Sequence, residues 1–419
     1  MEEIKQGYKQ TDIGVIPEDW DVFNVRHLGR FSKGSGINRA ESQTGEIPSI
    51  RYGEIYTTHN DYIKDFHSFI SVSVSKNARK LKNGDLLFTA SGETKEEIGK
   101  CVAFIDNIEA YAGGDILIIS PENRFNSLLL GFLLNAPYVV KQKANKGQGD
   151  AVVHITKDAL SDIVIALPKE TSEQTAIATA LGDVVALIAA MDKKITKKQQ
   201  IKQGAMQLLL TGKKRLPGFS GEWIEKSLSE IAEIFRGGSP RPIENYLTND
   251  VEGINWIKIG DVGVYAKYID YTAEKIIPEG VARSRYVTKG DFLLSNSMSF
   301  GRPYILRIDG CIHDGWLVIK NYSKTFKIDY LYYILGYDTT LIQYKSLAAG
   351  SSVLNLNKEI VSKIILPCPS KSEQVAIAQI LTDMDDEISQ LEADRNKYEQ
   401  IKAGMMQQLL TGKIRLNKN

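Results

Sequence analysis

The feature that most constrains this 419-residue chain is a repeat at an offset of 200 residues. From Glu173 to Leu216, 22 of the 44 residues are identical to the residue 200 positions further on. The matches include Glu-Gln at 173–174 and 373–374, and Leu-Leu-Thr-Gly-Lys at 209–213 and 409–413. The segments that precede the two copies are far less alike. A repeated frame with two divergent modules predicts a molecule that recognises two different targets at a set separation.

Each repeated segment is predicted to be one long helix. Ser172 and Ser372 stand next to Glu-Gln, which is typical of a helix start with acidic residues in its first turn. Gly212 and Gly412 follow the last apolar residues, where glycine suits the left-handed position after a helix. About 40 residues lie between these signals, which corresponds to roughly 60 Å of helix.

The apolar residues of both segments recur at alternating steps of four and three, which is the period of a coiled-coil seam. Two seams in one chain favour pairing with each other, antiparallel, with the modules at opposite ends of a rod and a pseudo-twofold axis between them. An ordinary amphipathic helix lying on a globular core is the alternative. The predicted seam comprises Ile177, Leu181, Val184, Ile188 and Met191 in the first segment, and Ile377, Leu381, Met384, Ile388 and Leu391 in the second.

Charged residues and glycines interrupt this seam. Lys198 and Lys202 stand where the first pattern would continue, and Arg395 and Lys402 do so in the second. Gly204 and Gly404 stand two residues after Lys202 and Lys402, which favours a close helix approach or a bend. Docking of a partner protein on this segment is the functional alternative.

The length suits two globular domains with connectors. We predict a first module at 1–166, a first helix at 167–216, a second module at 217–365 and a second helix at 366–419. The modules share a skeleton: Trp20 corresponds to Trp223, and both modules contain Gly-Asp turns before short apolar runs. Strand-like runs alternate with short helical segments, so the expected fold class is α+β.

Composition excludes several classes of protein. Lys and Arg number 52 against 51 Asp and Glu, so a nucleic-acid partner would need a local basic face or help from another subunit. The three cysteines lack metal-ligand or disulfide spacing and are typical of buried thiols in a reducing cytosol. The N-terminus lacks the apolar core of a signal peptide. No apolar run is expected to reach the ~18 residues of a membrane span.

No catalytic constellation stands out in the sequence. Asn135 to Tyr138 resembles the Asn-Pro-Pro-Tyr motif of adenine methyltransferases, but its first proline is replaced and no cofactor loop accompanies it. Asp85, Glu93 and Lys95 come nearest to a nuclease arrangement, without a counterpart in the second module. We interpret the first motif as a helix end with a turn and the second as a loop.

Binding chemistry is better represented, in glycine-rich basic loops. Arg, Lys, Asn and Gln can make paired contacts with base edges, and glycine-rich loops let backbone N–H groups approach phosphates. A merely solvated loop is the alternative at each position. The candidate DNA-binding residues are Lys33, Arg51, Tyr52, Ser91, Lys146 and Gln148 in the first module, and Arg236, Arg241, Lys258, Asn296, Arg302 and Ser351 in the second.

The opening segment Gly7 to Trp20, with its Ile-Gly-Val-Ile-Pro-Glu-Asp-Trp ending, resembles the start of specificity subunits of type I restriction–modification enzymes. So does the Leu-Pro-Gly-Phe-Ser-Gly-Glu-Trp segment from Leu216 to Trp223. The Ser-Glu-Gln-x-Ala-Ile-Ala openings and Leu-Leu-Thr-Gly-Lys endings are equally typical. The resemblance covers nearly the whole chain.

This resemblance implies that each module is a target-recognition domain for one half of an asymmetric, split DNA site, and that the helices set the gap. It implies assembly on double-stranded DNA with two modification subunits that methylate adenine, and with restriction subunits where these exist. S-adenosylmethionine, ATP and Mg are expected in those partners, and no catalysis, cofactor or metal in this cytoplasmic chain. The alternatives are a coiled-coil scaffold that binds only proteins, and a fragment of a methyltransferase or nuclease.

Overall fold

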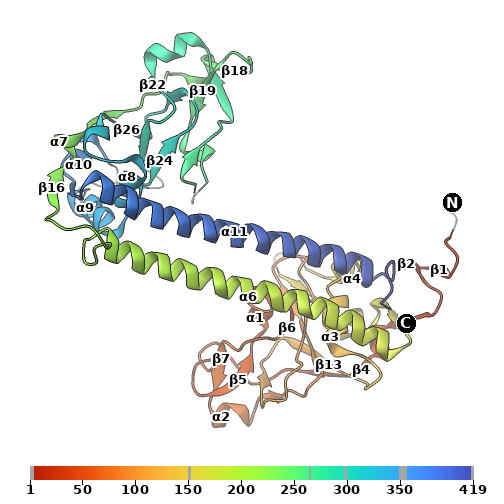
Figure 1. Ribbon diagram of the computed structural model, residues 1–419. Coiled ribbons are helices and arrows are strands. Elements are labelled where there is room, and N and C mark those ends of the chain that lie inside the picture. The colour runs from red at the N-terminus through yellow and green to blue at the C-terminus, as the bar shows by residue number, and fades with distance from the viewer. Residues whose placement is uncertain (1–3, 150–151, 264–265, 297–299, 349–355, 417–419) are drawn as a thin grey trace. The chain divides into compact units, whose positions relative to one another are not determined.

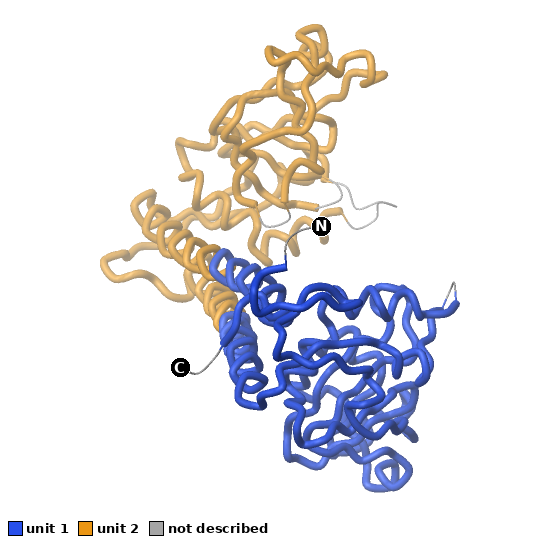
Figure 2. Tube along the Cα trace, turned by 90° about the vertical axis from the view of Figure 1, so that its right-hand side faces the viewer, with its two compact units in different colours: residues 1–193, 393–419 blue, residues 194–392 orange. Residues whose placement is uncertain are grey.

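The computed structural model describes residues 4–149, 152–263, 266–296, 300–348 and 356–416 (Figure 1). The chain forms two compact units, which comprise residues 1–193 with 393–419 and residues 194–392 (Figure 2). Each unit contains one module together with part of each long helix. The division therefore falls inside the helices, while the module boundaries predicted above stay predictions of the sequence.

The first unit is built on two main sheets. One has five strands in the order β4-β13-β9-β11-β6, and the other has four in the order β7-β5-β12-β8. Three two-stranded pairs, β1–β2, β3–β15 and β10–β14, complete the sheets. The strands are β1 (Tyr8–Thr11), β2 (Gly14–Pro17), β3 (Trp20–Asn24), β4 (Gly29–Lys33), β5 (Ile47–Ile50), β6 (Asp61–Tyr62), β7 (Ser68–Ile70), β8 (Arg79–Lys80), β9 (Leu86–Thr89), β10 (Ser91–Gly92), β11 (Cys101–Ala103), β12 (Tyr111–Ala112), β13 (Ile116–Pro121), β14 (Val153–His154) and β15 (Val164–Pro168). The short helices are η1 (Val25–His27), α1 (Tyr52–Thr57), α2 (Val72–Ser75), α3 (Ser127–Leu133), α4 (Pro137–Lys146) and α5 (Lys157–Ser161).

The second unit has two five-stranded sheets, in the orders β17-β26-β23-β24-β20 and β18-β21-β19-β25-β22, and the pair β16–β27. The strands are β16 (Ile224–Ser227), β17 (Glu233–Arg236), β18 (Leu247–Thr248), β19 (Ile254–Ile257), β20 (Tyr268–Ile269), β21 (Glu274–Ile276), β22 (Arg285–Val287), β23 (Phe292–Ser295), β24 (Pro303–Leu306), β25 (Gly310–Ile312), β26 (Trp316–Lys320) and β27 (Ile365–Cys368). The short helices are α7 (Leu228–Ile231), η2 (Ile243–Asn245), η3 (Ile259–Asp261), η4 (Pro278–Arg283), η5 (Tyr322–Lys324), α8 (Ile328–Leu335), α9 (Asp338–Ala348) and α10 (Lys358–Ser362).

The two modules have the same topology. In the five-stranded sheet of each, three antiparallel pairings are followed by one parallel pairing, β11 with β6 and β24 with β20. In the second sheet, β12 pairs in parallel with β5, as β25 does with β19. The predicted α+β internal repeat is therefore confirmed.

The repeated segments form two helices of 39 residues each, α6 (Thr171–Leu209) and α11 (Lys371–Leu409). Within the second unit, Lys198 bonds to Glu387, and Lys202 bonds to Asp385. Residue numbers thus increase along α6 in the direction in which they decrease along α11. Within the first unit, Arg395 Nε lies 3.0 Å from an oxygen of Asp192. The predicted antiparallel helix pair is confirmed.

The predicted seam serves two purposes. Ile177 and Leu181 are buried in the hydrophobic core of the first module, and Ile377 and Leu381 are buried in that of the second. Farther along the helices, Ile188 and Ile388 are also buried, whereas Val184, Met191, Met384 and Leu391 are only partly buried.

Val185, which the seam prediction left out, is the buried neighbour of Val184 and belongs to the core of the first module. This part of α6 packs on a globular core and follows the 3.6-residue period of a straight helix. A strict heptad pattern therefore places the buried position one residue too early here.

The charges that interrupt the seam are paired. Lys402 of α11 donates to Asp61 of β6 over 2.6 Å, and Asp61 is buried. Lys202 donates to Asp385. These lysines therefore attach the helices to each other and to the first module, while docking of a partner at this segment stays a hypothesis.

The glutamates of the repeated Glu-Gln motif join the start of each helix to the end of the other. Arg215, which follows α6, donates from Nε and NH2 to both carboxylate oxygens of Glu373 at 2.6 and 2.7 Å. Arg415, which follows α11, bonds Glu173 in the same way at 2.5 and 2.7 Å. Each helix end is thus joined to the start of the other helix by a two-pronged, charge-assisted contact.

The glutamines of the motif bind backbone atoms of the modules. Gln174 Nε2 donates to the carbonyl of Pro168, and its Oε1 accepts from the N–H of Asn126, both over 2.9 Å. Gln374 makes the equivalent bonds, to the carbonyl of Pro369 at 3.0 Å and from the N–H of Lys327 at 2.8 Å. The same motif occurs in both helices because each copy attaches its module through the same backbone hydrogen bonds, although the modules differ in sequence.

Helix α6 is also long and apolar enough, by length and composition, to cross a membrane, with a mean hydropathy of 1.6 over its most apolar 18 residues. A third of that stretch is buried inside the protein. The stretch includes polar positions, which is why a search for an uninterrupted apolar run does not detect it. Ile177, Leu181 and Val185 of α6 belong to the core of the first module, and core helices share this composition.

Candidate nucleic-acid interface

In the second module, the glycine-rich loop after β17 packs closely on the turn between β25 and β26. A Cβ atom on Gly237 would lie 2.0 Å from the carbonyl oxygen of His313, so only glycine fits there. This approach places residues 239–242 beside His313 and Asp314. The loop that the sequence analysis selected for its Arg, Gly and Pro content therefore meets a second loop with titratable groups.

Asp314 is the centre of this meeting point. The hydroxyl of Ser239 donates to its carboxylate over 2.7 Å, and Arg241 NH2 lies 3.6 Å from the other carboxylate oxygen. Arg236 Nε and Asn296 Nδ2 donate to the backbone carbonyl of Asp314 at 3.1 and 2.7 Å. The hydrogen bond from Ser239 lowers the pKa of Asp314, so this carboxylate is charged near neutral pH.

His313 is a structural group in this loop. Its Nε2 faces the backbone N–H of Ile259 at 3.0 Å, and its Nδ1 faces the N–H of Gly315 at 2.8 Å. Burial lowers the pKa of His313, which keeps the ring neutral at neutral pH. A neutral ring can accept one of these two hydrogen bonds, whereas a protonated ring could accept neither.

A pocket of about 970 Å³ opens between the two loops. Lys258 and Arg241 supply its positive charges, and Lys258 Nζ lies 2.7 Å from the carboxylate of Glu274. The Arg241 side chain is 80% exposed. The lining residues are Ser239, Pro240, Arg241, Pro242, Ile243, Glu244, Trp256, Lys258, Ile259, Gly260 and His313.

The first module has the same loop contact with different residues. A Cβ on Gly34 would lie 1.9 Å from the carbonyl oxygen of Gly113, so Gly34 and Gly113 correspond to Gly237 and His313. Lys33 precedes this glycine, is exposed, and lies 3.9 Å from Asp115. The shared backbone thus presents different side chains in the two modules.

Arg51 and Tyr52 lie at the start of α1 in the first module. The N–H of Arg51 donates to Glu54 over 2.8 Å, which closes the first turn of that helix, and Ser68 donates to the same carboxylate over 2.5 Å. Tyr52 is among the exposed large side chains of the chain. Tyr52 is therefore accessible, whereas Arg51 is half-buried.

Ser91, Lys146 and Gln148 gather at a second place in the first module. Ser91 Oγ lies 2.9 Å from Nδ1 of His154, and β10 pairs with β14. Gln148 and His154 exchange backbone hydrogen bonds of 2.9 and 2.8 Å. Lys146 lies 3.7 Å from Asp162. These three predicted residues thus share one loop cluster, and the N–H of Ala90, next to Ser91, donates to the carbonyl of Asp115, which faces Lys33.

The remaining predicted residues are placed differently. Asn296 is 1% exposed and supports the backbone of Asp314, so it has no accessible edge for direct contact with DNA. Arg302 precedes β24, and its backbone N–H donates to Ser295 Oγ over 3.0 Å. Ser351 lies outside the described residues.

The sequence analysis did not select Ser239, His313 or Asp314 as candidates. The available signal was divergence: His313 and Asp314 stand where the first module has Gly113 and Gly114. Arg215 and Arg415 were missed as well, although both belong to the repeated positions. Among the described residues, no group of three or more His, Cys, Asp or Glu side chains is placed to hold a metal ion.

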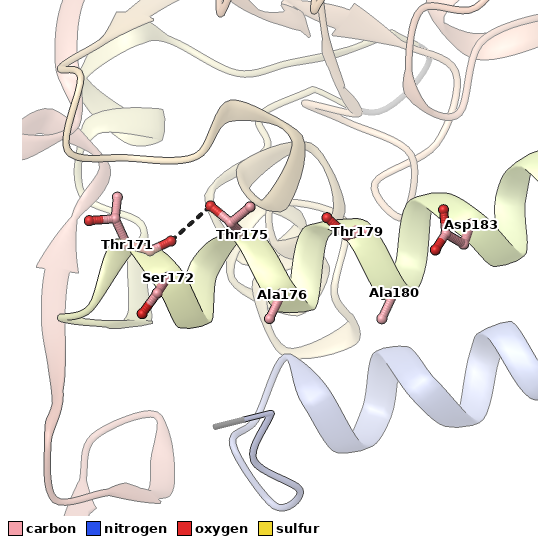
Figure 3. A pocket seen from close by; sticks show the side chains of 7 residues that line it. All are labelled: Thr171, Ser172, Thr175, Ala176, Thr179, Ala180 and Asp183. Carbon is pink, nitrogen blue, oxygen red and sulfur yellow. Dashed lines mark hydrogen bonds between the residues drawn. The ribbon is translucent and has the colours of Figure 1, made fainter. Parts of the chain in front are cut away.

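A further hollow of about 610 Å³ lies along the first turns of α6. Figure 3 shows that Thr171, Thr175, Thr179 and Asp183 succeed one another along the helix, with Thr175 bonded to the carbonyl of Thr171 over 2.8 Å. Ala176 and Ala180 line the hollow beside them. Small side chains make this face of α6 shallow.

The sequence matches the family described as the type I restriction modification DNA specificity domain, over residues 17–203 and again over 220–403. The two matched segments each contain one module and its helix. The chain belongs to this family of type I specificity subunits. Specificity subunits provide sequence-specific DNA recognition in restriction–modification, which agrees with two modules that share a backbone and differ in their loops.

Individual specificity subunits resemble this chain along almost its whole length. The MjaX protein of Methanocaldococcus jannaschii, described as a type I restriction enzyme specificity subunit, is 26% identical over 98% of this chain and 97% of its own. The crystal structure of the specificity subunit from M. genitalium matches 96% of this chain and 97% of its own with a TM-score of 0.60 and 13% identity. A second solved structure, from work on complex assembly and conformational transition of the type I R-M system, is also similar. Its matching chain has a TM-score of 0.57 and 14% identity, and the match covers 95% of this chain and 99% of that chain. The fold of a specificity subunit is therefore established here.

Proposed function

We propose that this specificity subunit directs a type I restriction–modification complex to an asymmetric, two-part DNA site. Each module recognises one half of the site, and the paired helices set the gap between the halves. The observation that supports this proposal most directly is the loop contact present in both modules. Gly34 and Gly237 fix the same backbone approach, while the side chains around them differ. Identical readers would require a palindrome, and different readers favour an asymmetric site.

The chain supplies recognition, and its partners supply the chemistry. We infer that S-adenosylmethionine is bound by modification subunits, and that ATP and Mg are bound by restriction subunits where these are present. The chain itself is proposed to be non-catalytic and to act in the cytoplasm. Its Lys and Arg residues number only 52 against 51 acidic residues, so the isolated subunit should bind DNA weakly at physiological salt.

The repeat also favours two copies of one partner. The open face of α6 from Thr171 to Asp183 has a sequence counterpart from Lys371 to Asp383 on α11. Two related surfaces on one chain suit two modification subunits. A restriction–modification complex of which a related chain forms part has been described structurally, which supports assembly with such subunits.

The decisive experiment is co-expression with the modification subunits of the same system, followed by single-molecule sequencing of methylated adenines. We expect one asymmetric motif in two parts with a fixed gap. Exchange of residues 217–365 for the module of another specificity subunit should change one half of the motif and leave the other half and the gap intact. Absence of any methylated motif would instead favour a scaffold that binds only proteins.

The role of the helices requires a separate perturbation. Removal of seven residues from both α6 and α11 shortens each by about 10 Å, because an α-helix rises 1.5 Å per residue. We expect a changed gap or a loss of methylation, with both half-sequences unaltered where methylation persists. An unchanged gap in the shortened protein would refute the proposal that the helices act as a spacer.

A further inference from the structure

We propose that Arg241, held by Asp314, recognises a guanine in the half-site of the second module. This inference rests on the proposed function and specifies one base contact within it. The pocket between residues 239–242 and His313 is the place where that contact would form. Four independent features of the pocket support this assignment.

The first feature is rigid presentation. Arg241 stands between Pro240 and Pro242. Proline fixes its own φ, and it also restricts the residue before it to extended conformations. Pro242 therefore restricts the backbone of Arg241, and Pro240 fixes the φ of the position before it, although the Arg241 side chain is 80% exposed. On binding, such an arginine loses side-chain freedom but little backbone freedom.

The second feature is orientation of the guanidinium group. Asp314 lies 3.6 Å from NH2 of Arg241 and is itself held by Ser239 and Asn296. At this distance the carboxylate attracts one side of the guanidinium group without a hydrogen bond, so the N–H donors stay available. A guanidinium group presents donors in a planar fork, which fits the O6 and N7 acceptors of guanine in the major groove.

The third feature is the balance of charge around the pocket. Arg241 is matched by Asp314, and Lys258 is matched by Glu274 at 2.7 Å. Glu244 adds a further negative charge to the lining. Such a site lacks the excess positive charge that attracts a phosphate, whereas the edge of a base is neutral and offers acceptors. The charges therefore favour base recognition over backbone contact.

The fourth feature is asymmetry between the modules. Asn38 lies four residues after Gly34, as Arg241 lies four residues after Gly237. Oδ1 of Asn38 accepts from two N–H groups of its own turn, at 2.9 and 3.1 Å. Gly114 stands in the place of Asp314. The first module thus lacks both members of the pair, so this contact belongs to one half-site.

The test compares Arg241→Ala, Arg241→Lys and Asp314→Asn in the full complex with its modification subunits, by sequencing of methylated adenines. We expect a guanine at one position of the second module's half-site to lose its requirement in Arg241→Ala. A bidentate arginine–guanine pair corresponds to roughly a 5- to 150-fold preference over other bases. Arg241→Lys keeps the charge but loses the planar fork, so it should be relaxed at the same position.

Asp314→Asn tests the positioning role of that residue. It should relax the same base position by a smaller factor, and no other position, whereas general damage to the loop would weaken every position. Arg39→Ala is the matched control, because Arg39 is an exposed arginine in the corresponding loop of the first module. We expect it to leave the second module's half-site unchanged.

Two results would overturn the assignment while leaving the proposed function intact. A half-site without any guanine–cytosine pair in the wild-type motif is one of them. The other is a uniform fall in methylation with Arg241→Ala, an unchanged motif and a shallower salt dependence, which is the signature of a phosphate contact. If the wild-type complex methylates no two-part motif, the proposed function fails instead. Thermal unfolding of each variant close to that of the wild type verifies that the loop is folded.

Discussion

The contact between Arg215 and Glu373 makes a quantitative prediction about how the second module is attached. Glu373 has a side chain that is 1% exposed, and Arg215 contacts both of its oxygens. In Arg215→Met, the buried carboxylate would keep only the hydrogen bond from Trp223 Nε1 at 3.1 Å. Leaving a buried charge without its partner costs about 3–5 kcal/mol. Arg215 is itself 27% exposed, so water can reach the site and the lower end of that range is expected.

A loss of about 3 kcal/mol corresponds to a fall in Tm of roughly 6–12 °C for a unit of this size. The measurement is thermal unfolding by circular dichroism and calorimetry, with Lys214→Met as a control because Lys214 is the exposed neighbour. In the double variant Arg215→Met/Glu373→Gln, much of the stability should return because no buried charge remains. A Tm of Arg215→Met within about 2 °C of the wild type would refute the reasoning, since that shift corresponds to less than ~1 kcal/mol.

Three further predictions concern the first unit. Burial lowers the pKa of His59 from 6.5 to about 4. As pH falls from 6.5 towards 4, the unfolded chain therefore binds a proton that the folded chain does not, and the unfolding free energy falls. His59→Gln should flatten this pH dependence, by up to about 1.4 kcal/mol per pH unit. Gly412→Ala should lower the Tm, because its φ of +68° is left-handed and the new Cβ would lie 2.4 Å from the ring of Pro17; the backbone strain alone costs about 1–2 kcal/mol. Lys402→Met should cost about 3 kcal/mol in chemical unfolding, because it leaves the buried carboxylate of Asp61 without its charged partner.

Each of these predictions has a matched control in the chain. His27 is exposed and lies in η1, so His27→Gln is the control and should keep the pH dependence of the wild type. Gly212 has a φ of +69°, and its Cβ would lie 3.3 Å from the ring of Trp223, so Gly212→Ala should cost less than Gly412→Ala. Lys397 is exposed, and Lys397→Met should be neutral in chemical unfolding. Equal effects in target and control would contradict the structural explanation in each case.

The sequence predicts the frame of this protein well because the frame is periodic. Two copies of a sustained apolar pattern, with start and stop signals, determine two long helices and their pairing. The prediction fails in detail at Val184, because there α6 packs on a globular core and the buried residue is Val185. The spacing of apolar residues shows which side chains are buried. It does not show whether the other helix or a globular module buries them.

The candidate site is less predictable because it depends on contacts between distant segments. Arg236 and Arg241 stand out for their residue type and their glycine-rich loop. Asp314, which lies beside Arg241, has no local signal, since the pairing of β17 with β26 brings the two loops together. Asn296 has a suitable side chain for base contact, but the fold buries it. Residue type therefore indicates what a side chain can bind, and only tertiary structure indicates what it can reach.

The glutamines at the head of each helix have an evolutionary consequence. Gln174 and Gln374 bind only main-chain atoms of their modules, so the attachment is indifferent to the side chains that those modules display. Substitutions in the loops proposed to contact DNA can accumulate without loosening this attachment. If these loops choose the DNA target, as proposed, new targets can arise by substitutions there at little risk to the folding of the whole.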